Sequence, residues 1–373
     1  MTPIAFMDLK SQARRLKAEI AARIDVVLEH GAYINGPEIA ELESALAALT
    51  GAGATVACSS GTDALVIPLM ALGVEAGDAV FVPAFTYNAT ANAVLLAGGV
   101  PVFVDIDSRT FNMDAGHLAD QIARVAREGR LKPKGVIAVD IFGLPADYEA
   151  IGAVASRHGL FVLADGAQSL GGKRLGTAVG AIAPVTATSF FPSKTLGGYG
   201  DGGAILVQDP ALVPLLQSIR WHGTDDARKE SVRVGMNGRL DSIQAAVLLV
   251  KLSIFQEEIA RRNAIAALYE QGLQGIAEIQ AVPPGYQSAR ALFVGLFRDR
   301  DRVQELLKAN GVPSVVYYAK QLHMHDAFRV FGQGPGSLPV SEEIGTRLLA
   351  LPFHPYMSDA QVEYVVETLQ TLP

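Results

Sequence analysis

Seven short apolar runs, most of them rich in valine, constrain the fold of this 373-residue chain more than any other feature. Amphipathic stretches such as residues 62–73 and 148–159 separate several of these runs. Near-continuous apolar strands that alternate with helices are typical of a mainly parallel sheet with helices on both faces. The sequence therefore predicts an α/β fold built on a mainly parallel seven-stranded sheet. The runs lie at residues 54–59, 78–83, 100–107, 135–143, 160–166, 186–191 and 202–209.

The segments on either side of these runs have helical patterns. Residues 9–31 and 36–51 carry apolar and charged residues at helical spacing, and each segment stops at a glycine. After Val207 the strand alternation fades, and residues 239–273 form a long helical stretch that we expect to be broken once.

The tail alternates again between strand and helix patterns, which is enough for a small α+β unit. We therefore expect a large domain over residues 1–250, which includes the N-terminal helices, and a small C-terminal α+β domain over residues 251–373. The tail strands are expected at residues 291–299 and 312–318, and the tail helices at 300–311 and 358–370.

Composition excludes several classes of protein. The net charge of −7 and the pI of about 5.6 argue against a nucleic-acid-binding protein, which would carry a basic surplus. The N-terminus lacks the pattern of a signal peptide, and no apolar run approaches the roughly 20 residues of a membrane span, so we expect a soluble cytoplasmic protein. The single cysteine, Cys58, cannot form an internal disulfide, and we interpret it as a small buried hydrophobe rather than a nucleophile.

Hydroxyl residues and a glycine lie where the first strand gives way to a helix. The segment "SSGT" at residues 59–62 precedes a helix that we expect to begin near Asp63. A helix N-terminus leaves about four backbone N–H groups without partners and carries partial positive charge, so this segment suits a phosphate. An ordinary helix cap is the alternative, because Ser, Thr and Asp all cap helices. Pro68 should bend this helix or shift its start.

Two further strands end in residues that could act on a ligand. Asp165 ends the run "FVLAD", and ligands of parallel sheets bind beyond the carboxyl ends of strands. Its carboxylate could hold a cationic ring nitrogen, although it could equally cap a helix. Lys194 follows the run "TATSFF" in an apolar, glycine-rich loop, where lost hydration would lower its pKa and favour a Schiff base with an aldehyde. A lysine in a surface turn is the alternative.

A tyrosine completes the set. Tyr87 follows the strand at residues 78–83, and its ring could stack on a heterocycle or belong to the core. Taken together, the four positions describe one ligand that has a phosphate, a flat ring with a basic nitrogen, and an aldehyde. Pyridoxal 5'-phosphate (PLP) has all three, with Lys194 as the residue that holds it covalently.

The motifs that carry these residues resemble a known family. "SSGTDAL", "ADGAQSLGG", "SFFPSK" followed by "LGGYGDGGA", and "VGMNGRLDSIQAAVL" are similar to the DegT/DnrJ/EryC1/StrS sugar aminotransferases, and the resemblance extends from "FMDLKSQ" to "LALPFHPYMSD". It implies the PLP-dependent transferase fold type I, which is aspartate aminotransferase-like. Within the family, "HGAYINGPE", "FFPSK" and "KLSIFQEEIA" resemble the UDP-2-acetamido-2-deoxy-3-oxo-glucuronate aminotransferases.

The resemblance implies a role for each matching residue. Lys194 matches the Schiff-base lysine that also moves the proton, and Asp165 matches the partner of the pyridinium nitrogen. Gln168 matches the residue near the ring oxygen, and Tyr87 matches the residue that stacks on the ring. Gly61, Thr62 and Ser189 match the phosphate seat, and Asn237 matches an asparagine that reaches the phosphate from a neighbouring subunit, so the resemblance implies a homodimer with shared active sites.

The substrate side departs from the family pattern. Many relatives carry a His-Tyr-Pro run near the sugar, where this chain has Tyr317, Tyr318 and Ala319. We expect Tyr317, Tyr318, Arg239 and His323 to contact the substrate, although a lone histidine is usually structural. No metal ligands are indicated.

The resemblance implies amino transfer from L-glutamate to the keto carbon of a UDP- or dTDP-linked sugar, in amino-sugar, polysaccharide or O-antigen biosynthesis. A 3-keto sugar is favoured, with a 4-keto sugar as the alternative. A PLP sugar dehydratase is disfavoured because that branch has histidine in place of Lys194. A non-catalytic PLP-binding regulator is disfavoured because Lys194, Asp165 and Gln168 are all present. A nicotinamide enzyme is disfavoured because no G-x-G-x-x-G follows the first strand.

Overall fold

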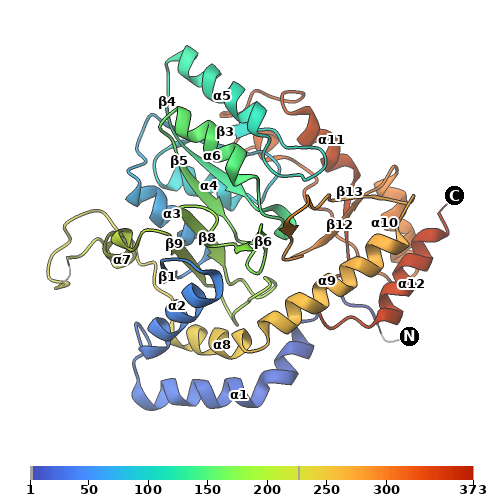
Figure 1. Cartoon of the computed structure of the whole chain (residues 1–373), viewed down its shortest axis with the longest axis horizontal. Coiled ribbons are helices and arrows are strands. Elements are labelled where there is room, and N and C mark those ends of the chain that lie inside the picture. Colours follow the sequence, from blue (N-terminus) through green and yellow to red (C-terminus); the bar gives the residue numbers. More distant parts are fainter. Residues whose placement is uncertain (1–2, 226, 373) are drawn as a thin grey trace.

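A seven-stranded sheet forms the centre of the molecule in the computed structural model, which describes residues 3–225 and 227–372 (Figure 1). The strand order is β1-β9-β8-β5-β4-β2-β3, and β9 alone runs antiparallel to its neighbours. All seven predicted strands are therefore confirmed. Their bounds are β1 Ala54–Cys58, β2 Asp78–Pro83, β3 Val100–Val104, β4 Lys132–Val139, β5 Phe161–Asp165, β8 Val185–Ser189 and β9 Gly203–Val207.

Both faces of this sheet are buried, as the near-continuous apolar runs predict. Strand β2 illustrates the cause, because successive side chains of a strand point to opposite faces. Val80 and Val82 pack into a core with helices α3, α4 and α7, whereas Ala79 and Phe81 pack into a second core with α5 and α6. The helices on the two faces are α3 Gly61–Ala71, α4 Ala89–Leu96, α5 Ala115–Glu128, α6 Tyr148–Arg157 and α7 Val213–Arg220.

Helix α3 corrects one detail of the sequence analysis. It begins at Gly61 rather than near Asp63, and it continues through Pro68 to Ala71. Pro68 is fully inside the protein, and its neighbours Ile67 and Leu69 are also buried. Burial of this apolar helix against the sheet therefore outweighs the backbone hydrogen bond that proline removes.

The N-terminal helices lie below the sheet in Figure 1, where both pack against helix α8 (Ser242–Leu252). Helix α1 (Leu9–His30) ends at Gly31 in a left-handed conformation, and α2 (Pro37–Thr50) ends at Gly51 in the same way. The long helical stretch is broken once, as predicted, into α8 and α9 (Phe255–Gly272).

A smaller three-stranded sheet, in the order β10-β12-β13, lies at the C-terminal end beside α9, α10 and α12 (Figure 1). The predicted strand at 291–299 and both predicted tail helices are present, but residues 312–318 do not form a strand. Only Val315 bridges to Ala350 of β13, a strand that the sequence analysis did not predict and that pairs along its other side with β12. The bounds are β10 Glu278–Ile279, β12 Phe293–Leu296, β13 Leu348–Leu351, α10 Arg300–Ala309, α11 Pro339–Arg347 and α12 Asp359–Gln370.

Short elements complete the described chain. Strands β6 (Lys173–Arg174), β7 (Thr177–Ala178) and β11 (Tyr286–Gln287) form a small sheet that joins the two parts of the chain, and η1 (Ile141–Gly143), η2 (Pro210–Leu212) and η3 (Leu322–Met324) are single 3₁₀ turns. The division into domains at residues 1–250 and 251–373 stays a prediction. Within the described ranges, none of the helices has both the length and the apolar character that crossing a membrane requires.

Candidate active site

Three strands bring the predicted residues to one edge of the central sheet. Asp165 ends β5 and Ser189 ends β8, and these two strands run parallel. Strand β9 pairs antiparallel with both β8 and β1, and its first residue, Gly203, lies opposite both Ser189 and Cys58. The carboxyl end of β1, and so the start of α3, therefore lies at the same edge as Ser189. This is the edge at which parallel α/β sheets bind ligands.

The start of α3 has both the side-chain cap of an ordinary helix and the free backbone N–H groups of an anion-binding site. Ser60 is the N-cap, and its hydroxyl accepts a 3.0 Å hydrogen bond from the backbone N–H of Asp63. Gly61 and Thr62 form the first turn, where backbone N–H groups lie beyond the reach of helical partners. A Cβ on Gly61 would lie 2.6 Å from the Cβ of Ser189, so the two backbones approach as closely as glycine permits.

Asp165 is almost completely buried. Its Oδ2 accepts a 2.8 Å hydrogen bond from the hydroxyl of Thr90, and its Oδ1 accepts a 3.2 Å bond from the N–H of Ala167. Burial raises the pKa of Asp165, while these two bonds and the charge of Lys194 act in the opposite direction. A buried carboxylate with so few donors has unused capacity for a cationic partner.

Lys194 lies in the loop directly after β8. Its side chain is half-buried, and burial lowers the pKa of its amine, while the charge of Asp165 raises it. The structure therefore brings the amine and the carboxylate within electrostatic reach of each other, as the sequence predicted. A lysine with a lowered pKa is the form of the residue that attacks carbonyl carbon.

Gln168 connects the sheet edge with the segment from the C-terminal part of the chain. Its Oε1 accepts a 2.7 Å hydrogen bond from the N–H of Phe142, and its Nε2 lies 3.4 Å from the hydroxyl of Tyr318. The ring of Tyr318 packs edge-on against Phe85 and against Tyr317. Of the expected substrate residues, the two tyrosines thus lie beside the candidate site.

Other expected residues lie differently. Tyr87 is 59% exposed, so the alternative that it belongs to the core is wrong. His323 is 1% exposed, with its Nε2 3.1 Å from Glu342 and its ring against Phe103, which is a structural environment rather than an open one. Its contact with substrate stays a prediction that this burial does not favour.

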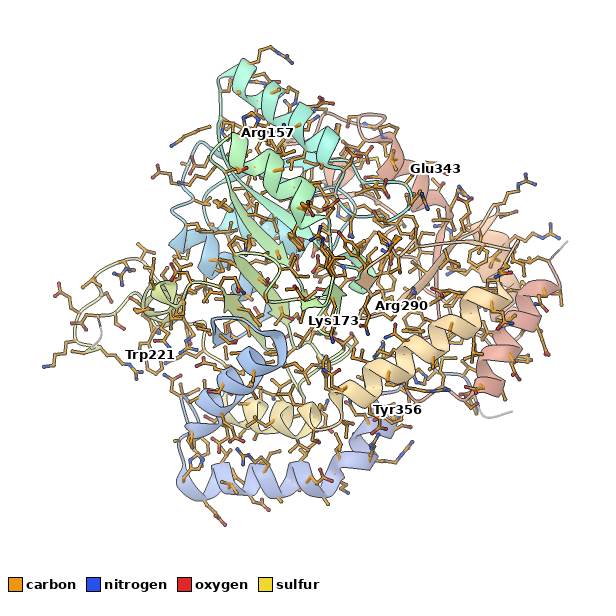
Figure 2. All side chains as sticks on the ribbon, in the orientation of Figure 1. Arg157, Lys173, Trp221, Arg290, Glu343 and Tyr356 are labelled. Atoms are coloured by element: carbon orange, nitrogen blue, oxygen red, sulfur yellow. The ribbon has the colours of Figure 1, made fainter. Side chains whose placement is uncertain are left out.

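Asn237 and Arg239 lie in the loop that follows α7, near Trp221. The side chain of Arg239 donates a 2.8 Å hydrogen bond to Asn237, and its guanidinium lies over the ring of Trp221. Trp221 lies on the side of the molecule away from Arg290 and Tyr356 (Figure 2). Within residues 3–225 and 227–372, no hydrogen bond or ion pair joins Asn237 or Arg239 to Lys194 or Asp165, although the carbonyl of Gly238 accepts a 3.1 Å hydrogen bond from the N–H of Ser59.

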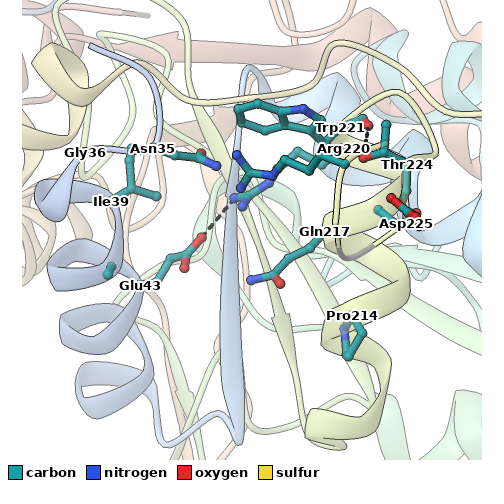
Figure 3. A pocket seen from close by; sticks show the side chains of 13 residues that line it. Asn35, Gly36, Ile39, Glu43, Pro214, Gln217, Arg220, Trp221, Thr224 and Asp225 are labelled. Atoms are coloured by element: carbon teal, nitrogen blue, oxygen red, sulfur yellow. Dashed lines mark hydrogen bonds and ion pairs between the residues drawn. The ribbon is translucent and has the colours of Figure 1, made fainter. Parts of the chain in front are cut away.

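The same region holds a cavity of about 480 Å³ between α2 and the end of α7 (Figure 3). Arg220 crosses it to form a 2.9 Å ion pair with Glu43 and also donates to the carbonyl of Ala57. None of the residues predicted to hold the cofactor lines this cavity. Arg220 joins the end of α7 to β1, and the cavity shares no lining residue with the predicted cofactor site.

The sequence analysis missed the residues that orient the predicted ones. Thr90 bonds Asp165 from the first turn of α4, and Phe142 bonds Gln168 from a backbone with a φ of 58°. These contacts join elements that are distant in sequence, so spacing alone carries no signal for them. Among the described residues, no group of three or more His, Cys, Asp or Glu side chains is arranged to hold a metal ion.

Comparison with known proteins shows the family of the chain. A model of the DegT/DnrJ/EryC1/StrS aminotransferase family matches residues 14–370. The chain belongs to this family. A UDP-2-acetamido-2-deoxy-3-oxo-D-glucuronate aminotransferase of Pseudomonas aeruginosa is 43% identical over 367 residues, which cover 98% of this chain and 99% of the relative.

Solved structures of the family have the same fold over nearly their whole length. A DegT/DnrJ/EryC1/StrS aminotransferase from Brucella abortus is 45% identical with a TM-score of 0.96, and the match covers 98% of each chain. S. venezuelae DesV, in complex with a ketimine intermediate, is 33% identical with a TM-score of 0.94, and the match covers 99% of this chain and 98% of DesV. The predicted family and the PLP fold type I are confirmed.

Proposed function

We propose that this family member is a PLP-dependent aminotransferase that moves an amino group from L-glutamate to the keto carbon of a nucleotide-linked sugar. The proposal rests mainly on one observation. Lys194 and Asp165 lie within electrostatic reach of each other at the carboxyl ends of the parallel strands, beside the N-terminus of α3. An amine of lowered pKa, a buried carboxylate and an anion seat are the three groups that PLP requires of a protein.

The residues present fit that cofactor. The close approach of Gly61 to Ser189 leaves backbone N–H groups and a hydroxyl free to surround a phosphate, in a space that a Cβ would fill. Asp165 would hold a protonated ring nitrogen, because its carboxylate is buried with only two other donors. When bound, PLP supplies an electron-withdrawing ring that stabilises negative charge on the substrate carbon.

The chain's own residues would then divide the work. Lys194 would bind the cofactor covalently and, once released, move a proton at the substrate carbon, for which a pKa lowered toward neutrality suits a general base. Gln168 would lie near the oxygen substituent of the PLP ring. Its side-chain amide is oriented by the hydrogen bond that it accepts from the N–H of Phe142. Tyr87, exposed beyond β2, would cover one face of the ring.

The substrate assignment draws on the relatives. The Pseudomonas protein is named for a UDP-linked 3-oxo sugar acid, and the ketimine in DesV is a C=N bond of the kind that an amine forms with a keto carbon. We therefore favour a 3-keto sugar linked to UDP, with dTDP as the other nucleotide and a 4-keto sugar as the alternative. The product would serve polysaccharide or lipopolysaccharide biosynthesis in the cytoplasm.

A homodimer is part of the proposal. Asn237 is exposed and, among the described residues, has no hydrogen bond to this chain's own Lys194, and the loop around it carries exposed Val232 and Val234. A second copy of the chain could bury these valines and receive Asn237 at its phosphate seat. The non-catalytic alternative is disfavoured, because Lys194, Asp165 and Gln168 are all present.

One assay panel tests the proposal. The purified protein is mixed with PLP, and L-glutamate is added while the absorbance of the bound cofactor is followed. The proposal predicts that glutamate changes the spectrum and that one 3-keto nucleotide sugar restores it with release of an amino sugar. A spectrum unchanged by glutamate contradicts the donor, and restoration by 4-keto sugars alone contradicts the favoured acceptor.

A further inference from the structure

Two side chains on one face of helix α8 reach the loop that carries Lys194. The side-chain Oε1 of Gln244 accepts a 2.8 Å hydrogen bond from the backbone N–H of Tyr199. The Nζ of Lys251 donates a 2.6 Å hydrogen bond to the carbonyl of Gly197. The two residues are seven positions apart, which places them on the same helix face two turns from each other.

The carbonyl that Lys251 holds belongs to a closed turn around Lys194. The N–H of Lys194 donates to the carbonyl of Phe191 at 2.9 Å, and the N–H of Gly198 donates to the carbonyl of Phe190 at 2.7 Å. A Cβ on Gly197 would lie 2.3 Å from the carbonyl oxygen of Pro192, so the two sides of the turn touch. A displacement of Gly197 therefore displaces the backbone of Lys194.

Lys251 is an unusual residue to find at this place, because it is only 3% exposed. Burial lowers its pKa to about 8, and the charge of Glu258 opposes the shift. Its ammonium lies 4.4 Å from the centre of the Tyr199 ring. A buried cation destabilises a protein unless its donors are satisfied, and a methionine of similar length would fill the same space at less cost.

Glu258 links Lys251 to more distant parts of the chain. It is 4% exposed and accepts hydrogen bonds from the amide of Gln12 in α1 and from the hydroxyl of Tyr356, which Figure 2 shows beside α9. The negative charge of Glu258, whose position is fixed by these hydrogen bonds, therefore stabilises the positive charge of Lys251. The ammonium of Lys251 donates its hydrogen bond to the carbonyl of Gly197. The reaction proposed above makes no use of either residue.

We propose that Lys251, assisted by Gln244, is a positioning residue that fixes the loop of residues 190–199. The fixed loop in turn keeps the Lys194 amine in place and shields it from water. The inference rests on the proposed role of Lys194 as the residue that binds PLP. Lys251 itself touches neither cofactor nor substrate in this account, and it acts through the carbonyl of Gly197.

The test compares Lys251→Met, Gln244→Leu and the double variant Lys251→Met/Glu258→Gln with the native protein. The double variant leaves no unpaired buried carboxylate, so it separates the loss of the loop contact from the loss of charge balance. Lys17→Met is the matched control, because Lys17 is an exposed lysine on a neighbouring helix.

The first readout is amide hydrogen exchange of the cofactor-free proteins. We expect the amides of Lys194, Gly198 and Tyr199 to exchange about tenfold faster in the Lys251 variants, which corresponds to the loss of one charge-assisted hydrogen bond. In Gln244→Leu the change should be centred on Tyr199. Lys17→Met should exchange as the native protein does.

The second readout is the pH titration of the absorbance of the PLP-loaded proteins. A loosened loop admits water to Lys194, and hydration favours the protonated form, so the midpoint should rise by more than about half a pH unit. A merely structural role of Lys251 would lower the melting temperature without moving this midpoint. If Lys251→Met does not fold, the same two measurements are made on the double variant and on Gln244→Leu.

Unchanged exchange at residues 194–199 together with an unchanged midpoint in variants that fold would overturn the inference. If instead the proposed function is wrong, the native protein itself will not bind PLP at Lys194. The exchange measurement needs no cofactor, so it still decides whether Lys251 holds the loop.

Discussion

The sheet edge around Asp165 and Lys194 differs from the segment at residues 312–325 in how its backbone is held. At the edge, Asp165 and Ser189 end strands and Gly61 begins a helix, so their positions follow from the ladder of the central sheet, and Lys194 lies in the loop directly after β8. The segment has no such support. It is attached by the Val315 bridge to Ala350 and by single bonds such as that from the N–H of Leu322 to the carbonyl of Ala84 at 3.0 Å.

The difference indicates a division of roles within the site. Chemistry common to all substrates needs groups fixed to within a fraction of an ångström, which regular elements provide. Choice among sugars requires only that a surface segment change its side chains, which irregular segments tolerate. Changes at the edge should therefore reduce turnover of every substrate, whereas changes in the segment should alter which sugar is used.

The largest expected effect belongs to Lys194→Ala. Loss of the residue that we propose binds the cofactor and moves the proton should reduce kcat by about three orders of magnitude or more. Steady-state assay of amino-sugar release measures this. The matched control is Lys173→Ala, because Lys173 is an exposed lysine on the short strand β6. A Lys194→Ala protein that turns over at the native rate would remove the basis for the comparison.

The next effect is that of Asp165→Asn. The neutral amide is nearly isosteric and can still accept the hydrogen bond from Thr90, but it carries no charge to keep a ring nitrogen protonated. We expect kcat to fall about 100-fold or more for all sugars alike, while the fold is retained. Thermal unfolding checks the fold, and Thr90→Val should show a smaller loss. A fall in kcat confined to one sugar would contradict the role of Asp165 as the partner of the ring nitrogen.

Gly61→Ala tests the phosphate seat with a smaller change. The new Cβ would meet the Cβ of Ser189 at 2.6 Å, so either the helix start or the strand end must move. We expect the dissociation constant of PLP to rise about tenfold, as measured by titration of the cofactor-free protein. Gly152→Ala is the control, because a Cβ on that helical glycine meets nothing within 4 Å. It should leave PLP binding unchanged.

Tyr317→His addresses the other region. This change places histidine where many members of the family have it, and the Tyr317 side chain lies among Phe6 and Tyr318 outside any regular element. We expect KM to change a few-fold and differently for different keto sugars, with PLP binding unchanged. Tyr364→Phe in α12 serves as the control. An equal loss of kcat for every sugar would show that the segment also serves the chemistry.

The sequence predicted the sheet edge better than the irregular segment, and the reason is physical. Strand periodicity and helix starts are local signals, so the seven strands and the helix start near Gly61 could be predicted from neighbouring residues. Residues 312–318 also read as a strand, but only Val315 pairs with β13, and the extent of that pairing depends on tertiary contacts rather than on local periodicity. Thr90, Gln244 and Lys251 carried no signal, because their roles arise only where distant helices meet the loops.

The central claim is that Lys194 forms the covalent link to PLP, and reduction with borohydride tests it most directly. The protein is loaded with PLP, reduced, digested, and analysed by mass spectrometry of its peptides. The account predicts a pyridoxyl-phosphate mass on the peptide that contains Lys194, and its loss when L-glutamate is added before reduction. A mass carried by any other lysine, with the peptide of Lys194 unmodified, would contradict the account.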